Sequence, residues 1–196
     1  MLIIVTNRKL CRDDFLKRIQ LLAKGKPDAI MLREKDLSVC EFESLTSKVK
    51  TICEENQVPL IINQNIFVAE KLELPNIHLS MNDLRKTKNE IQFFTQIGAS
   101  VHSIDEAKEA EKLGASYLVA GHIFSTNSKK GVPPRGLAFL NKVCHSVKIP
   151  VFAIGGISED KMKPISTTGA KGVCIMSEAM ICEDPVGVTD QFNILF

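Results

Sequence analysis

The alternation of short apolar segments with longer amphipathic ones constrains the fold of this chain more than any other feature. Eight apolar segments rich in β-branched residues recur along it: Leu2–Thr6, Ala29–Arg33, Pro59–Asn63, Asn76–Ser80, Ile97–His102, Ser116–Gly121, Pro150–Gly155 and Gly172–Ser177. Most are nearly continuously hydrophobic, which is typical of parallel strands buried on both faces. We therefore predict that these segments form parallel β-strands.

Helical patterns occupy the intervals between these strands. Apolar residues recur at helical spacing in Asp13–Ala23, Ser103–Leu113, Leu137–Val147 and Ser158–Thr167. Another helix is expected to begin at Ser38, where Glu41 completes a capping box, and Ser103 with Glu106 repeats this design. A weaker helix is predicted around Lys86–Phe94, and the last helix, within Asp184–Phe196, is predicted to be irregular because it contains Pro185 and Gly187.

Strand and helix alternate eight times in 196 residues, which predicts a single-domain α/β fold, the TIM (β/α)8 barrel, over residues 1–196. An open doubly wound sheet is the alternative, but no G-x-G-x-x-G follows the first strand. The chain is shorter than the usual barrel of about 250 residues. Its helices and loops are therefore expected to be compact.

The composition argues against several classes of protein. The formal net charge is only +2, and the chain has no Trp and one Tyr, so we expect no nucleic-acid partner. The longest apolar runs are too short to span a membrane, and we expect no membrane partner. The six cysteines form no C-x-x-C pair, and the start Met1-Leu2-Ile3-Ile4 shows no n-region of a signal peptide, so we expect none. A reduced, cytoplasmic protein is predicted.

Polar residues concentrate at the ends of the predicted strands. They comprise Arg33, Glu34 and Lys35, then Asn63, Ser80, Ser100, His102, the segment Gly121–Lys130, Gly155, Gly156 and Ser177. In a (β/α)8 barrel the carboxyl ends of the strands form the active site. A random distribution would not favour one end of the strands, so this pattern predicts an enzyme.

A phosphate site is predicted at the ends of the last two strands. Gly155 and Gly156 end one strand just before a helix. Glycines let the backbone approach a ligand closely, and the free N–H groups at the start of a helix attract a phosphate. Ser177 adds a hydroxyl from the next strand end. A tight turn without a ligand is the alternative, but the glycine turn and Ser177 together favour a phosphate site.

The segment Gly121–Gly131 is dense in hydroxyl, amide and lysine groups. Thr126 and Ser128 can supply short hydrogen bonds to a small anion, and Lys129 can supply charge. Lys129 and Lys130 also suit a solvated loop, yet a segment of this kind leaving a barrel strand favours a mobile lid over an anion.

Two pairs of residues share a face because an extended chain has a period of two. Arg33 and Lys35 can hold a carboxylate or a diphosphate, or they can be solvated charges neutralised by Glu34, and the spacing favours neither. Ser100 and His102 form the second pair, and histidine is suited to proton transfer near neutral pH. His78 and His122, at other strand ends, are alternatives to His102.

These residues, in this order, resemble the thiamine phosphate synthase superfamily. The resemblance runs from Ile4-Val5-Thr6 to Val173–Ser177 and includes Leu32-Arg33-Glu34-Lys35, Ile62-Asn63, His78-Leu79, Asp83, the Ser100/His102 segment, Thr126–Lys129 and Pro150–Ile157. One branch joins a hydroxymethylpyrimidine diphosphate to a thiazole phosphate and releases diphosphate with Mg²⁺. The other, the TenI-type thiazole tautomerases, aromatises a thiazole carboxylate phosphate by moving a proton, without a metal.

Three departures from the synthase pattern favour the tautomerase branch. Met31 stands where the synthase has Gln, Gln64 stands where it has a metal-binding Asp, and His122 stands where it has Pro. Gln64 cannot give an anionic ligand to a hard cation. Asp83, in contrast, matches the second metal ligand of the synthase.

The resemblance therefore implies a thiazole tautomerase of thiamin biosynthesis that needs no cofactor, with His102 as the catalytic residue. Its predicted substrate and phosphate contacts are Arg33, Lys35, Asn63, Ser100, Thr126, Ser128, Lys129, Gly155, Gly156 and Ser177. The first alternative is a thiamine phosphate synthase, with Mg²⁺ at Asp83. The second is a non-catalytic regulatory or thiazole phosphate-binding protein. The resemblance also suggests a homodimer.

Overall fold

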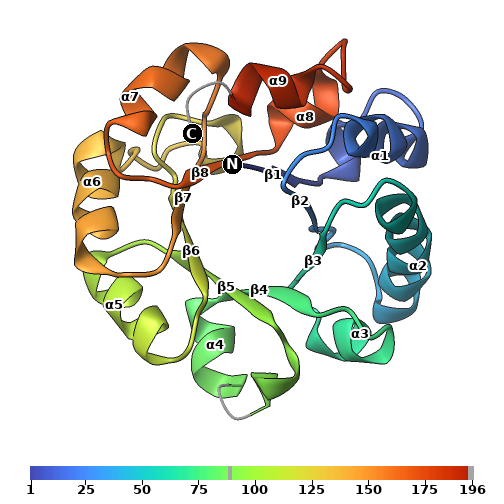
Figure 1. Cartoon of the computed structure of the whole chain (residues 1–196), viewed down its shortest axis with the longest axis horizontal. Coiled ribbons are helices and arrows are strands. Elements are labelled where there is room, and N and C mark those ends of the chain that lie inside the picture. Colours follow the sequence, from blue (N-terminus) through green and yellow to red (C-terminus); the bar gives the residue numbers. More distant parts are fainter. Residues whose placement is uncertain (88–89, 194–196) are drawn as a thin grey trace.

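The computed structural model describes residues 1–87 and 90–193, and within them eight parallel strands close into a barrel (Figure 1). The strands are β1 (Leu2–Val5), β2 (Ala29–Leu32), β3 (Leu60–Asn63), β4 (Asn76–Ser80), β5 (Gln96–Val101), β6 (Tyr117–Gly121), β7 (Val151–Ile154) and β8 (Gly172–Ile175). Each strand pairs with the next, and β8 closes the barrel on β1, with Cys174 opposite Ile3. The predicted (β/α)8 barrel is confirmed.

Helices surround the barrel on its outside (Figure 1). They are α1 (Phe15–Lys24), α2 (Val39–Glu55), α3 (Ile66–Lys71), α4 (Met81–Thr87), α5 (Ile104–Lys112), α6 (Gly136–Ser146), α7 (Met162–Ser166), α8 (Ser177–Ile181) and α9 (Val188–Asn193). Short 3-10 helices lie at Arg8–Leu10, Ile91–Phe93, Asn127–Lys129 and Glu159–Lys161. None of the helices in the described ranges combines the length and apolar character needed to cross a membrane.

The predicted caps set the start of two helices. Ser38 begins α2 with a complete capping box, because its hydroxyl accepts from the Glu41 N–H and the Glu41 carboxylate accepts from the Ser38 N–H. Ser103 begins α5 by accepting from the Glu106 N–H at 3.0 Å. The Glu106 carboxylate, however, accepts from the N–H of His102 at 2.6 Å, so it ties down the end of β5 instead.

The structure differs from the sequence-based prediction in its shorter helices. The helix expected around Lys86–Phe94 instead begins at Met81, because Met81 and Leu84 are buried against the barrel, and residues 88–89 lie outside the described ranges. The sequence analysis missed α3, whose N-cap Asn65 accepts from the N–H of Val68. Ser177 starts α8 and does not end β8. The helix expected within 184–196 is α9, with residues 194–196 outside the description.

Side chains of the strands alternate between two apolar layers. Those facing into the barrel include Ile3, Val5, Ala29, Met31, Ile61, Tyr117, Val119, Phe152 and Cys174. Those facing the helices form a larger layer that includes Leu2, Ile4, Ile30, Leu32, Ile62 and Leu118. Burying each large apolar side chain contributes roughly 1.5–3 kcal/mol. Because these side chains fill the barrel interior, we expect a ligand to bind at the ends of the strands.

Candidate active site

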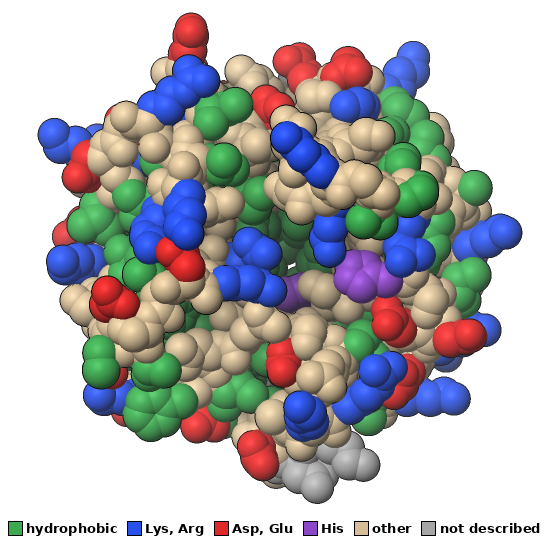
Figure 2. All heavy atoms as spheres, turned by 180° about the vertical axis from the view of Figure 1, so that it is seen from behind, with side chains coloured by type: hydrophobic (Ala, Val, Ile, Leu, Met, Phe, Trp, Pro, Cys, Tyr) green, Lys and Arg blue, Asp and Glu red, His purple; other side chains and the backbone are tan. Residues whose placement is uncertain are grey.

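A cavity of about 400 Å³ lies at the ends of β1, β5, β6, β7 and β8. Most of the predicted site residues line it, namely Arg33, His102, Thr126, Ser128, Lys129, Gly155, Gly156 and Ser177. Apolar side chains of Val5, Ile154, Cys174 and Met176 also line it. Figure 2 shows lysine, arginine and histidine side chains gathered around a central hollow at one end of the barrel. The cavity thus combines apolar walls with a cationic rim.

The positive charges at this rim lie close to one another. Partial burial lowers the pKa of Lys35, and the neighbouring charges of Arg33 and Lys129 lower it further, while Asp83 opposes them. Lys35 and Asn63 line an adjoining open pocket with Gln64 and do not line the central cavity. The three cationic side chains outnumber the nearby carboxylate of Asp83. Such an excess of positive charge favours the binding of a multiply charged anion.

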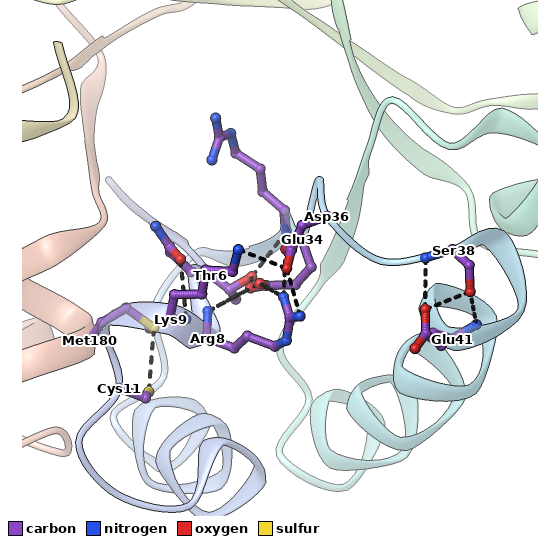
Figure 3. A network of polar contacts seen from close by, with 11 residues as sticks. Thr6, Arg8, Lys9, Cys11, Glu34, Asp36, Ser38, Glu41 and Met180 are labelled. Atoms are coloured by element: carbon purple, nitrogen blue, oxygen red, sulfur yellow. Dashed lines mark hydrogen bonds and ion pairs between the residues drawn. The ribbon is translucent and has the colours of Figure 1, made fainter.

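The buried carboxylate of Glu34 contacts Thr6 and Arg8 (Figure 3), and among the described residues it forms no ion pair with Arg33 or Lys35. It accepts a 2.8 Å hydrogen bond from the Thr6 hydroxyl, whose oxygen accepts in turn from the Arg33 N–H at 3.0 Å. The backbone N–H of Arg8 donates to both Glu34 oxygens. This network joins the loops after β1 and β2 and fixes the backbone from which Arg33 projects.

The sequence analysis read Glu34 only as a possible neutralising charge and missed this network. Arg8, which Glu34 holds, also forms an ion pair with Asp36 at 2.6 Å. Because the partners Thr6 and Glu34 are 28 residues apart, no local pattern signals their contact. The only hint in the sequence is an acidic residue, Glu34, between two cationic ones at a predicted strand end.

The turn Gly155–Gly156 packs closely on the loop after β6. Its φ angles are +101° and +64°, which favour glycine. A Cβ on Gly155 would collide with His122, and a Cβ on Gly156 would collide with the Ser125 carbonyl. The Phe124 N–H donates to the Gly155 carbonyl at 3.0 Å. The two glycines therefore let two loops meet at the cavity wall.

Several donors surround this turn. The ammonium group of Lys161, which the sequence analysis did not single out, donates to the Gly156 carbonyl at 2.8 Å. The N–H groups of Gly156 and Ile157, both lining the cavity, find no hydrogen-bond partner in the described residues. Ser177 contributes an exposed hydroxyl at the cavity wall. Free N–H groups and a nearby ammonium group suit a phosphate.

The three strand-end histidines occupy different settings. His102 lines the cavity, and its Nδ1 lies 2.7 Å from the Gly121 carbonyl oxygen, so Nδ1 carries the proton and Nε2 is free to accept. His122 lies 3.2 Å from the Val132 carbonyl through Nε2 and anchors the loop that carries Lys129. His78 is buried in the barrel interior, where its Nε2 lies 2.7 Å from the Ser100 hydroxyl.

Asp83 provides a carboxylate at the end of β4. Its Oδ2 accepts from the Ser80 hydroxyl at 2.6 Å and from the Gln64 amide at 2.9 Å. Burial raises the pKa of Asp83, but these hydrogen bonds outweigh it and lower the pKa below its ordinary value. Among the described residues no group of three or more His, Cys, Asp and Glu side chains is placed to hold a metal ion. A cation here would depend on Asp83 and on the ligand.

Comparison with known proteins reveals close relatives. The family model described as thiamine monophosphate synthase (TMP-TENI) matches residues 2–179. A thiamine-phosphate synthase of Clostridium acetobutylicum is 35% identical over 100% of this chain and 92% of its own. One from Fusobacterium nucleatum is 37% identical over 89% and 86%. The solved structure of thiamine phosphate pyrophosphorylase from Pyrococcus furiosus has a TM-score of 0.86 at 31% identity, covering 97% of this chain and 92% of that one.

These relatives contradict the prediction of a thiazole tautomerase, which is corrected accordingly. Proteins 32% to 38% identical over most of the chain are named thiamine-phosphate synthase, so they favour the synthase alternative. The role of His102 in proton abstraction depended on the tautomerase and is withdrawn with it. The match of the family model and the likeness along nearly the whole chain agree: this chain belongs to the thiamine monophosphate synthase family.

Proposed function

We propose that this protein is a thiamine-phosphate synthase, which joins hydroxymethylpyrimidine diphosphate to thiazole phosphate and releases diphosphate. The names of its relatives support this assignment. The observation that carries it is that a group of cationic side chains and a turn with free N–H groups lie at the same end of the barrel. Arg33, Lys35 and Lys129 form the cationic region, and Gly156 with Ser177 belongs to the second region. A reaction between a diphosphate and a monophosphate needs two such regions.

The cationic region is the proposed diphosphate site. The diphosphate leaving group gains negative charge as its bond to the pyrimidine methylene carbon breaks. Positive charges fixed near that group bind the charge more strongly in the transition state than in the substrate. Glu34 and Thr6 hold the Arg33 backbone, so part of this region is organised before the substrate binds.

The second region is the proposed thiazole phosphate site. Gly156 and Ile157 offer free N–H groups, and Ser177 offers a hydroxyl. The apolar side chains of Val5, Ile154 and Met176 line the same cavity and suit the faces of heteroaromatic rings. They also limit the access of water, which would otherwise compete with the thiazole for the activated carbon.

Magnesium fits this site when it is bound together with the diphosphate. Mg²⁺ is commonly held by one or two carboxylates plus substrate phosphates and water. Asp83 supplies one carboxylate, and its lowered pKa keeps it ionised at neutral pH. When bound, the ion would neutralise charge on the departing diphosphate. Asp83 would hold it, and Ser80 and Gln64 orient that carboxylate.

Two adjacent lysines provide a matched test of the diphosphate site. Lys129 lines the cavity, whereas its exposed neighbour Lys130 is not among the lining residues. With Mg²⁺ and both substrates, Lys129→Ala should reduce kcat/KM for diphosphate release by about 10- to 100-fold, the effect of losing a hydrogen bond to a charged group. Lys130→Ala should remain within about twofold of the parent. Equal effects of the two substitutions would refute the proposed site.

A further inference from the structure

A line of three polar side chains runs through the barrel interior beneath the rim. The Tyr117 hydroxyl on β6 lies 3.3 Å from Nδ1 of His78 on β4. Nε2 of the same ring lies 2.7 Å from the hydroxyl of Ser100 on β5. Tyr117 and His78 are buried, whereas Ser100 is half-buried. Ser100 is paired across the sheet with Ser80, whose hydroxyl donates to Asp83. The line therefore ends one strand away from Ser80 and Asp83, the carboxylate proposed to hold Mg²⁺ together with the diphosphate.

The ring of His78 is neutral, because burial lowers its pKa to about 3. A neutral imidazole has one donor nitrogen and one acceptor nitrogen, so two arrangements of protons are possible along the line. In the first, Tyr117 donates to Nδ1 and Nε2 donates to Ser100. In the second, Ser100 donates to Nε2 and Nδ1 donates to Tyr117.

The two arrangements differ in what they leave unpaired. In the second, the proton of the buried Tyr117 hydroxyl has no acceptor among the described residues, which is costly in an apolar interior. In the first, every buried donor and acceptor of the line is paired. The proton of Ser100 is the one left over, and Ser100 is the member of the line that lies nearest the rim. Hydrogen-bond satisfaction therefore selects the first arrangement.

Gly98 makes the meeting of Tyr117 and His78 possible. It lies on β5 two residues before Ser100 and opposite both His78 and Tyr117 in the strand register. A Cβ at this position would collide with the Tyr117 ring and with Nδ1 of His78. Because Gly98 has no side chain, the Tyr117 hydroxyl and the His78 ring can meet across β5.

We infer that Tyr117 and His78 are positioning residues that fix the Ser100 hydroxyl as a hydrogen-bond donor to the diphosphate. Tyr117 sets the tautomer of His78, His78 occupies the acceptor side of the Ser100 oxygen, and the Ser100 proton is directed at the ligand. The inference rests on the proposed function for the identity of the anion. The tautomer itself is independent of the reaction.

The first experiment reads the tautomer of His78 by NMR. In ¹⁵N-labelled protein at neutral pH, long-range ¹H–¹⁵N correlations distinguish a protonated ring nitrogen from an unprotonated one. The chain has four histidines, so spectra of His102→Gln, His122→Gln and His145→Gln assign the other three and leave His78. The inference predicts the proton on Nε2. A proton on Nδ1 would overturn it, and this readout needs neither substrate nor turnover.

The second experiment measures binding of inorganic diphosphate with Mg²⁺ by calorimetry. Ser100→Ala should weaken binding by about tenfold, and Tyr117→Phe, which leaves Ser100 in place, by about threefold to tenfold. Phe152→Leu is the matched control, because Phe152 packs edge-on against Tyr117 at 5.8 Å between ring centres without a hydrogen bond. It should stay within about twofold of the parent. Parent-like binding by Ser100→Ala or Tyr117→Phe would overturn the inference.

Failure of the inference is distinguishable from failure of the proposed function. A protein that condenses the two substrates but carries the His78 proton on Nδ1 contradicts only the positioning role. One that shows the predicted tautomer and diphosphate affinities without condensing the substrates contradicts only the synthase assignment.

Discussion

The Gln64 side-chain amide donates a 2.9 Å hydrogen bond to the carboxylate of Asp83, and so links the end of β3 to the first turn of α4. Asp83 receives a second hydrogen bond from Ser80, and together they keep its pKa low. This part of the rim therefore has one oriented carboxylate beside a neutral amide. The amide supports the carboxylate and adds no negative charge of its own.

A second carboxylate at position 64 should strengthen the binding of magnesium. Gln64 has a φ of +67°, a conformation that Asp and Asn adopt readily, so Gln64→Asp is compatible with the backbone. The Mg²⁺ concentration for half-maximal diphosphate release should fall by about tenfold, because Mg²⁺ favours anionic oxygen ligands. Gln64→Asn is the neutral control. An unchanged magnesium requirement in Gln64→Asp would contradict a metal site at Asp83.

The close packing of Gly156 on Ser125 predicts a specific loss in Gly156→Ala. The added Cβ would collide with the Ser125 carbonyl and push apart the loops after β6 and β7. We expect KM for thiazole phosphate to rise by at least about tenfold. Gly114→Ala is the control, since Gly114 also has a positive φ, +91°, but a Cβ added there would meet no atom within 4 Å. Similar KM values in the two variants would contradict a specific role of the Gly156 packing in binding thiazole phosphate.

Loss of the Glu34 carboxylate should destabilise the fold and weaken the diphosphate site together. Glu34→Ala leaves the Arg8 N–H and the Thr6 hydroxyl without their acceptor, at a cost of about 2–4 kcal/mol in the free energy of unfolding. Asp36→Asn removes a more exposed partner of Arg8, where solvent screens the ion pair, and should cost much less than Glu34→Ala. Urea unfolding measures both, and equal losses would argue against the proposed role of Glu34.

Burial of His78 predicts a dependence of stability on pH. Its pKa is about 3 in the folded protein and about 6.5 in the unfolded chain, so only the unfolded state binds the proton between these values. The stability contributed by His78 is therefore nearly constant above pH 6.5 and falls as the pH drops below it. From pH 7 to pH 5 this amounts to about 2 kcal/mol. Between pH 7 and pH 5, the free energy of unfolding of His78→Gln, measured with urea, should therefore fall by that much less than the free energy of the parent. An equal fall in both proteins would contradict the buried neutral ring.

The barrel could be predicted from the sequence because its signals are local. Buried parallel strands such as Ala29–Leu32 appear as apolar runs, and Ser38 with Glu41 specifies a helix start within four residues. Helices of five or six residues, such as α3 and α8, are too short to show a period of 3.6. The start of α4 was missed because Ser80 both ends a strand and accepts from the Asp83 N–H.

The lining of the cavity was predictable where glycines and lysines follow a strand, as at Gly155 and Lys129. Its supporting contacts were not, because they join distant segments: Thr6 with Glu34, and His78 with Ser100 and Tyr117. The branch of the family was predicted wrongly from single departures such as Gln64 and His122. A single substitution at a rim position changes local chemistry without specifying which reaction the whole cavity performs.

The central claim is tested most directly by incubating the purified protein with hydroxymethylpyrimidine diphosphate, thiazole phosphate and Mg²⁺. We predict that diphosphate is released in equal amounts with thiamine phosphate, that omitting either substrate stops the release, and that chelating Mg²⁺ abolishes it. No diphosphate release above that of a protein-free sample would contradict the assignment as a thiamine-phosphate synthase.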